Sequence, residues 1–149
     1  LLYFTGFSRT SADIQVETQK NLKSKTDTLL EMLKLVDEAE KILTSKTDLN
    51  EFGRLLDHTW KLKRGLAQKV STGSIDDIYA QALKAGALGG KLLGAGGGGF
   101  LLFYVTPEKQ AAVKKSLSSL LQVPFCFETG GTRVIHYTPE DYDDHKEGE

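Results

Sequence analysis

Eight of the fifteen glycines of this chain fall in one stretch, Gly86-Ala-Leu-Gly-Gly-Lys-Leu-Leu-Gly-Ala-Gly-Gly-Gly-Gly99. Glycine loses more backbone entropy on folding than any other residue, so such a cluster in a folded domain needs a reason. The usual reasons are positive φ angles, or a second segment that must approach the backbone closely. A run of N–H groups with no side chains over them also forms a concavity that binds anions.

The residues on either side of this stretch predict its place in the fold. Helical periodicity precedes it over residues 75–85, and an apolar run typical of a buried strand follows at residues 100–105. We therefore predict a single glycine-rich loop from a helix to a strand. The spacing of Gly94, Gly96 and Gly99 matches a dinucleotide-binding fingerprint, but that fingerprint requires the strand first and the helix second. A purely structural turn is the alternative, although an ordinary connection of this type needs only one or two glycines.

Two helices are predicted, one before and one after a break at residues 44–47. A first helix is expected over residues 11–43 after the capping box Thr10-Ser-Ala-Asp13, and a second after Asp48-Leu-Asn-Glu51. Trp60 lies on the apolar side of the second helix and is expected in the core. The connection between these helices is short, so they should be antiparallel neighbours. The apolar stripe of the first helix comprises Leu22, Leu29, Leu33, Val36 and Leu43.

The remaining elements give an α+β domain with a mostly antiparallel sheet. A short strand is expected at residues 1–4, and a further helix after Thr106-Pro107. Residues 123–127 and 132–137 are predicted to be strands that form a hairpin through Gly130-Gly131. Residues 138–149 are acidic and polar and are interpreted as a frayed tail. The folded domain is therefore expected to span residues 1–137.

Composition excludes several classes of function. The chain has 149 residues, a net charge of −1 and no apolar run near the roughly 20 residues that a membrane span requires. Neither nucleic acid nor a membrane is therefore expected as a partner. The single cysteine, Cys126, is expected to be a small buried apolar residue. Because the sequence starts in an apparent strand and without Met, we interpret it as an excerpt from a longer protein, with the cytoplasm as the expected compartment.

Four segments carry a resemblance to a known family. The segment Gly90-Lys-Leu-Leu-Gly-Ala-Gly-Gly-Gly-Gly-Phe-Leu-Leu-Phe103 resembles the C-terminal motif of the GHMP kinases. Three more resemble the heptose 7-phosphate kinase branch: Tyr3-Phe-Thr-Gly-Phe-Ser-Arg-Thr-Ser-Ala-Asp-Ile14, Glu51-Phe-Gly-Arg-Leu-Leu-Asp-His-Thr-Trp-Lys-Leu-Lys-Arg64 and Ile75-Asp-Asp-Ile-Tyr79. The resemblance covers residues 1–137. It implies a ferredoxin-like (βαββ-type) C-terminal domain with long antiparallel helices, in a kinase that uses ATP and Mg²⁺ to phosphorylate a sugar or sugar phosphate.

Three groups of residues are predicted to bind substrate or phosphate. The resemblance places the glycine-rich motif beside the active site. Ser8 and Arg9 open a helix, where a guanidinium and free N–H groups favour a phosphate, although a helix cap and a solvated arginine explain them equally well. Lys63 and Arg64 are either a solvated face or cations that neutralise a phosphorylated sugar. The predicted residues of the motif are Lys91, Gly94, Ala95, Gly96, Gly97, Gly98 and Gly99.

Other parts of a complete kinase do not occur in this sequence. The nucleotide-binding loop of the family, of the type Pro-x-x-x-Gly-Leu-Gly-Ser-Ser, is absent, and no catalytic or metal-binding residue is assigned here. Since phosphoryl transfer requires a positioned nucleotide, metal and base, this chain alone is expected to be inactive and to work with its own N-terminal kinase domain. The alternative is a non-enzymatic ligand-binding or regulatory module on the same fold. An RNA-binding sheet is disfavoured, because the aromatic strands lack interleaved basic residues.

Overall fold

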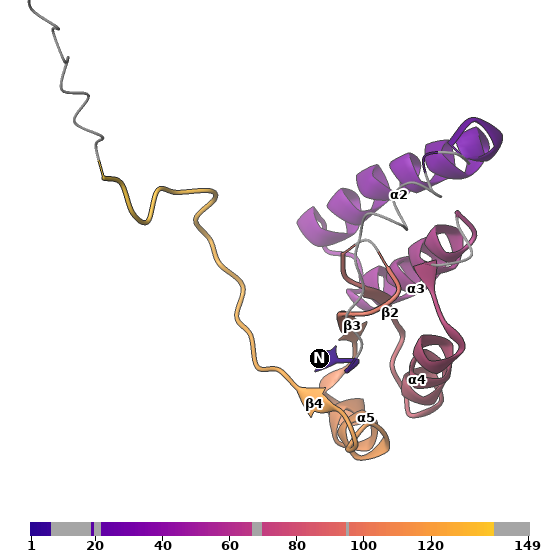
Figure 1. The fold of residues 1–149 in the computed structure, drawn as a ribbon, viewed down its shortest axis with the longest axis vertical. Coiled ribbons are helices and arrows are strands. Elements are labelled where there is room, and N and C mark those ends of the chain that lie inside the picture. The colour runs from indigo at the N-terminus through magenta and orange to yellow at the C-terminus, as the bar shows by residue number, and fades with distance from the viewer. Residues whose placement is uncertain (7–18, 20–21, 67–69, 95, 139–149) are drawn as a thin grey trace, which may run out of the picture.

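The computed structural model describes residues 1–6, 19, 22–66, 70–94 and 96–138. These residues form a four-stranded sheet with helices packed on it (Figure 1). In chain order the elements are β1 (Leu2–Phe4), the 3-10 turn η1 (Leu22–Lys25), α2 (Thr26–Thr44), α3 (Asn50–Arg64), α4 (Gly73–Lys84), β2 (Gly89–Leu92), β3 (Phe100–Tyr104), the 3-10 turn η3 (Pro107–Lys109), α5 (Gln110–Ser116) and β4 (Leu121–Gln122).

The strands lie in the spatial order β2-β3-β1-β4, and every neighbouring pair is antiparallel. On the central strand β1, Tyr3 lies opposite Leu101 of β3 and Gln122 of β4. The helices α2, α3 and α4 connect β1 to the hairpin β2–β3, and α5 connects β3 to β4. This is the predicted α+β, ferredoxin-like arrangement, and the structure confirms it.

The last strand is shorter than predicted. Val123 N donates a hydrogen bond to Leu2 O (2.9 Å), and the next residue, Pro124, has no N–H to continue the ladder. Residues 123–138 form neither strand nor helix. The predicted strands at residues 123–127 and 132–137 and their hairpin are therefore wrong, because Pro124 interrupts the ladder directly after Val123 and no residue beyond Gln122 is in a strand in the described part of the chain. Cys126 is exposed in this segment, so its predicted burial is wrong as well.

The core lies between the sheet and the helices α3, α4 and α5. Trp60 of α3 is fully buried, as predicted, and its ring centroid lies 6.1 Å from that of Tyr79 on α4. Tyr79 in turn lies 5.6 Å from Phe103 of β3. This aromatic row joins two helices to the sheet. The other buried members of the core are Tyr3, Val70, Ile75, Ala82, Ala87, Leu92, Leu101, Val105, Val113 and Leu117.

Helix α2 packs against α3 (Figure 1), but with a different side from the one predicted. Leu33, Val36 and Leu43 of the predicted stripe are more than half exposed, at 63%, 60% and 56%. The stripe prediction is therefore wrong for these residues, because apolar residues recur at helical spacing on two sides of α2 and periodicity does not distinguish them. The less exposed side carries Met32, Leu35, Ala39 and Ile42.

Two glycines let the backbones of α3 and β2 come close together. A Cβ added to Gly89 of β2 would lie 2.0 Å from Gly53 O of α3, and one added to Gly53 would lie 2.7 Å from the ring of Tyr104. The prediction of one uninterrupted loop over residues 86–99 is therefore wrong. Residues 89–92 are a strand, in which Gly89 allows the close approach of α3, and a Cβ at Gly90 would lie 2.4 Å from Leu102 O of β3. Residues 86–88 before it, and 93–94 and 96–99 after it, lie outside helix and strand.

A hydrogen-bonded tyrosine fastens α4 to the same place. The Tyr79 hydroxyl accepts from Gly90 N (3.1 Å) and donates to Asp57 Oδ1 (2.9 Å), and Asp57 also pairs with Lys61 (2.6 Å). Burial, followed by the Asp57 carboxylate, raises the pKa of Tyr79 far above its usual value. The hydroxyl therefore stays protonated and links α3, α4 and β2.

We predict that Gly89→Ala destabilises the fold by about 2–4 kcal/mol, since the new Cβ cannot fit against α3 without moving the helix. Urea unfolding measures the change. The matched control is Gly73→Ala at the start of α4, where a Cβ meets no atom within 4 Å. If both variants unfold at the same urea concentration, the close packing of α3 on β2 is not a constraint.

We also predict that Tyr79→Phe costs about 1–3 kcal/mol of unfolding free energy, because it leaves the buried Gly90 N–H without its acceptor. Tyr104→Phe is the control, since the Tyr104 hydroxyl has no hydrogen-bond partner among the described residues. It should stay within about 0.5 kcal/mol of the parent. Equal losses in both variants would contradict a specific role for the Tyr79 hydroxyl.

Candidate functional site: the glycine loop between β2 and β3

The loop of residues 93–99 connects the two strands of a hairpin. Leu93 N donates to Phe100 O (2.8 Å) at its base. The backbone then turns through positive φ at Gly94 (82°), Gly96 (120°), Gly97 (74°) and Gly99 (104°). Position 96 requires glycine for two reasons: its φ is positive, and an added Cβ would lie 2.8 Å from Val70 O. The glycines of this half of the motif are therefore used for torsions that other residues rarely adopt.

Three segments distant in sequence hold this loop. Thr5, at the end of β1, donates to Gly99 O from both its N–H and its Oγ1 (2.9 Å each). Gly97 N donates to Val70 O (3.0 Å), between α3 and α4. Lys63 Nζ, from the last turn of α3, donates to Gly94 O (2.7 Å) and lies 3.5 Å from Leu92 O. The loop thus lies where the end of β1 meets the end of α3.

Positive charge gathers at this end of the hairpin. Burial, followed by the nearby charge of Lys91, lowers the pKa of Lys63. Within the described part of the chain, neither lysine forms an ion pair with a carboxylate. In the same part of the chain, the N–H groups of Gly94 and Gly98 make no hydrogen bond. Cations and free amides together are the donors that bind phosphate or carboxylate groups.

The structure brings together only some of the predicted site residues. Lys63, Lys91 and the loop glycines lie side by side. Arg64 instead pairs with Asp76 Oδ2 of α4 (2.7 Å), and Ser71 Oγ donates to the other oxygen of the same carboxylate (2.6 Å). A phosphate-binding role for Arg64 stays a prediction. Ser8, Arg9 and Ala95 lie outside the described residues, so their predicted roles also stay predictions.

Two residues that hold the loop were not predicted from the sequence. Thr5 is only 3% exposed, and its hydroxyl contacts a residue 94 positions away. Val70 contributes a backbone carbonyl, which no side-chain pattern reveals. Thr5 follows an apolar strand and precedes Gly6, and this position at a strand end is the one signal that could have indicated it.

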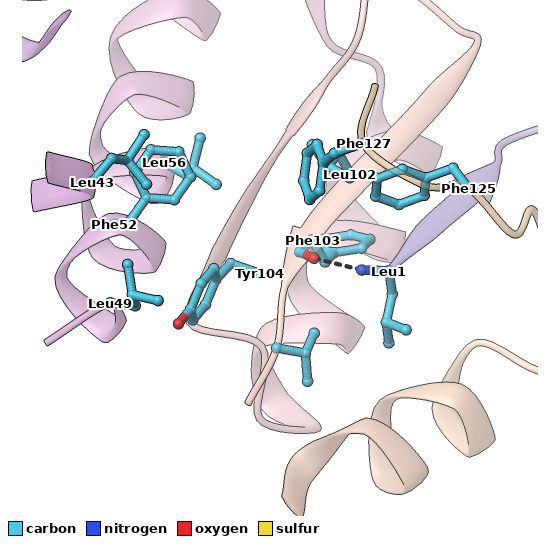
Figure 2. A pocket seen from close by; sticks show the side chains of 11 residues that line it. Leu1, Leu43, Leu49, Phe52, Leu56, Leu102, Phe103, Tyr104, Phe125 and Phe127 are labelled. Atoms are coloured by element: carbon cyan, nitrogen blue, oxygen red, sulfur yellow. Dashed lines mark hydrogen bonds between the residues drawn. The ribbon is translucent and has the colours of Figure 1, made fainter. Parts of the chain in front are cut away.

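Neither of the two cavities described for this chain is lined by the glycine loop. An apolar groove of about 310 Å³ lies between the α2–α3 junction and the face of β3, next to Leu1, whose N-terminal nitrogen donates to Phe103 O (Figure 2). A second cavity of about 220 Å³ lies between α2 and α3, where His58 Nε2 lies 2.9 Å from Glu31 Oε1. Gly94 at the tip of the loop is exposed, whereas Gly96 and Gly97 are buried.

The described residues form neither a metal centre nor a membrane span. No group of three or more His, Cys, Asp and Glu side chains is arranged to hold a metal ion there. None of the described helices combines the length and apolar character needed to cross a membrane.

Comparisons with known proteins identify the family. The family described as GHMP kinases C terminal matches residues 32–122. The D-glycero-alpha-D-manno-heptose 7-phosphate kinase of Campylobacter jejuni is 32% identical over 119 residues, which cover 78% of this chain and 35% of that protein. A mevalonate kinase of Thermococcus sibiricus is 30% identical over 120 residues, covering 76% of this chain and 36% of that protein.

A solved structure agrees with these matches. The mevalonate kinase of Methanococcus jannaschii superposes with a TM-score of 0.66 at 29% identity, covering 79% of this chain and 35% of that one. The chain thus spans about a third of the length of the relatives it matches. Together with the β2–β3 hairpin and its glycine loop, these matches show that the chain belongs to the GHMP kinase family and corresponds to the C-terminal domain of its members.

Proposed function

We propose that this chain is the substrate-side domain of an ATP-dependent kinase that phosphorylates a hydroxyl of a sugar phosphate. The observation that carries the proposal is the glycine loop, with Lys63 and Lys91 beside it and no ion-paired carboxylate on either within the described part of the chain. Such a site suits a dianionic phosphate, which two ammonium groups and free N–H groups would neutralise and orient.

Each part of the chain has a defined task in this proposal. The loop amides and Lys91 bind the phosphate group of the acceptor, and Lys63 adds its positive charge beside them. Ser8 and Arg9 would bind the sugar or its phosphate in this proposal. Arg64 would contribute its positive charge from the rim while paired with Asp76. ATP and Mg²⁺ would be held mainly by the N-terminal kinase domain, which also supplies the catalytic base.

A heptose 7-phosphate is the best candidate for the acceptor. The relatives at about 30% identity include a heptose 7-phosphate kinase and a mevalonate kinase, so the family alone leaves the acceptor open. The segments at residues 3–14 and 51–64 favour the heptose branch, because they resemble it beyond the shared glycine motif. Two lysines at the loop also match the charge of a phosphate better than that of a single carboxylate.

We predict that the full-length protein consumes ATP with Mg²⁺ and a heptose 7-phosphate, and that the unphosphorylated heptose raises KM by at least about tenfold, since the loop loses its anion. A coupled ADP-release assay measures both, with mevalonate as the competing acceptor. If mevalonate is phosphorylated faster than the heptose 7-phosphate, mevalonate and not the sugar phosphate is the better substrate. Phosphate binding without ATP consumption for any acceptor would favour the non-enzymatic binding module.

We predict that Gly97→Val in the full-length protein lowers kcat/KM by about 100-fold or more, because a β-branched residue at φ 74° displaces the loop from Val70. Circular dichroism and the unfolding midpoint check that the variant is folded. Gly73→Ala, far from the loop in the chain, is the matched control and should keep parental kinetics. Unchanged turnover in a folded Gly97→Val variant would show that the loop is not part of the active site.

A further inference from the structure

The three contacts that hold the glycine loop differ in kind. Those at Thr5 and Val70 lie in buried surroundings, since Thr5, Val70, Gly96 and Gly97 are all buried. The third is a single ammonium group, that of Lys63, which reaches the exposed Gly94 from another element. Gly94 lies at the tip of the loop. Among the contacts described, the exposed tip is held by the Lys63 side chain, and the buried part by Thr5 and by the backbone of Val70.

The last turn of α3, which carries Lys63, is itself held in place by other contacts. Lys63 lies in the last turn of α3, next to Arg64, which is tied to α4 through Asp76 and Ser71. Gly65 N closes the same turn on Leu62 O (3.0 Å). Because the end of α3 is anchored on both sides, the ammonium of Lys63 defines where Gly94 lies.

The two lysines of the site therefore differ in what they contact. Lys63 Nζ donates to the loop backbone at Gly94 O and approaches Leu92 O. Lys91 lies on β2 opposite Leu102 and is partly exposed, and its charge acts on Lys63. It forms no ion pair with a carboxylate among the described residues. A cation already bonded to the loop is suited to shaping it, while an unpaired one is suited to meeting an anion.

We propose that Lys63 is a positioning residue that holds the tip of the glycine loop in its binding shape, and that Lys91 provides the charge that contacts the anion. The assignment of the anion as the acceptor's phosphate rests on the proposed function, whereas the tether itself does not. The proposal predicts different consequences for removing each lysine. Loss of Lys63 loosens the loop even without ligand, and loss of Lys91 weakens only anion binding.

Hydrogen–deuterium exchange on the full-length protein tests the tether without any ligand. In Lys63→Met, amides of the peptide over residues 92–100 should exchange about fivefold faster, as expected for loss of one charge-assisted hydrogen bond. Lys63→Arg should restore protection, since its guanidinium can donate to both carbonyls. Lys91→Met and Lys61→Met should exchange like the parent, the latter because Lys61 pairs with Asp57 on the same helix.

Inorganic phosphate, titrated by calorimetry, tests the division of tasks. Lys91→Met and Lys63→Met should each weaken binding by about tenfold, and Lys63→Arg should recover most of it. If Lys63→Met weakens phosphate binding but leaves loop exchange unchanged, Lys63 is a direct ligand and the positioning role is overturned. If phosphate binds none of the proteins, the proposed anion site fails, and the exchange rates still decide whether Lys63 tethers the loop.

Discussion

The backbone contact between α3 and β2 is the constraint on which the rest of this domain depends. Gly53 and Gly89 remove the side chains that would separate a helix from an edge strand. With the helix this close, Trp60 reaches the core and Asp57 reaches the Tyr79 hydroxyl. Ten residues beyond Gly53, Lys63 then meets the loop that follows β2. The fold and the candidate site are therefore set by the same contact.

Much of the fold could be predicted from local signals. An unbroken apolar run indicated the strand β3. The helix that begins near Gly73 and the turn at Thr106-Pro107 each follow a residue suited to capping or a proline. Strand β2 could not be recognised, because two glycines and a lysine in four residues hide any alternation of side chains. For residues 123–137 the reverse holds, since alternating apolar residues indicate a strand that lacks a partner in space.

The candidate site shows the same division between local and distant information. Glycine density alone indicated the loop, and the positive φ angles account for its second half. The contacts from Thr5, Lys63 and Val70 come from segments that are close only after folding, so no local spacing predicts them. The sequence left Arg64 as either a solvated side chain or a cation that neutralises a phosphorylated sugar. Neither interpretation included the ion pair with Asp76, which links the end of α3 to α4.

The outer strands of the sheet also bear on how the protein behaves in a crowded solution. On β2, the side chains of Tyr79 and Lys63 occupy main-chain groups of Gly90 and Leu92 that another strand could otherwise join. On the opposite side, β4 offers only two residues before Pro124 stops further pairing. Both margins therefore offer few main-chain groups to a further strand, which limits edge-to-edge association of such a sheet.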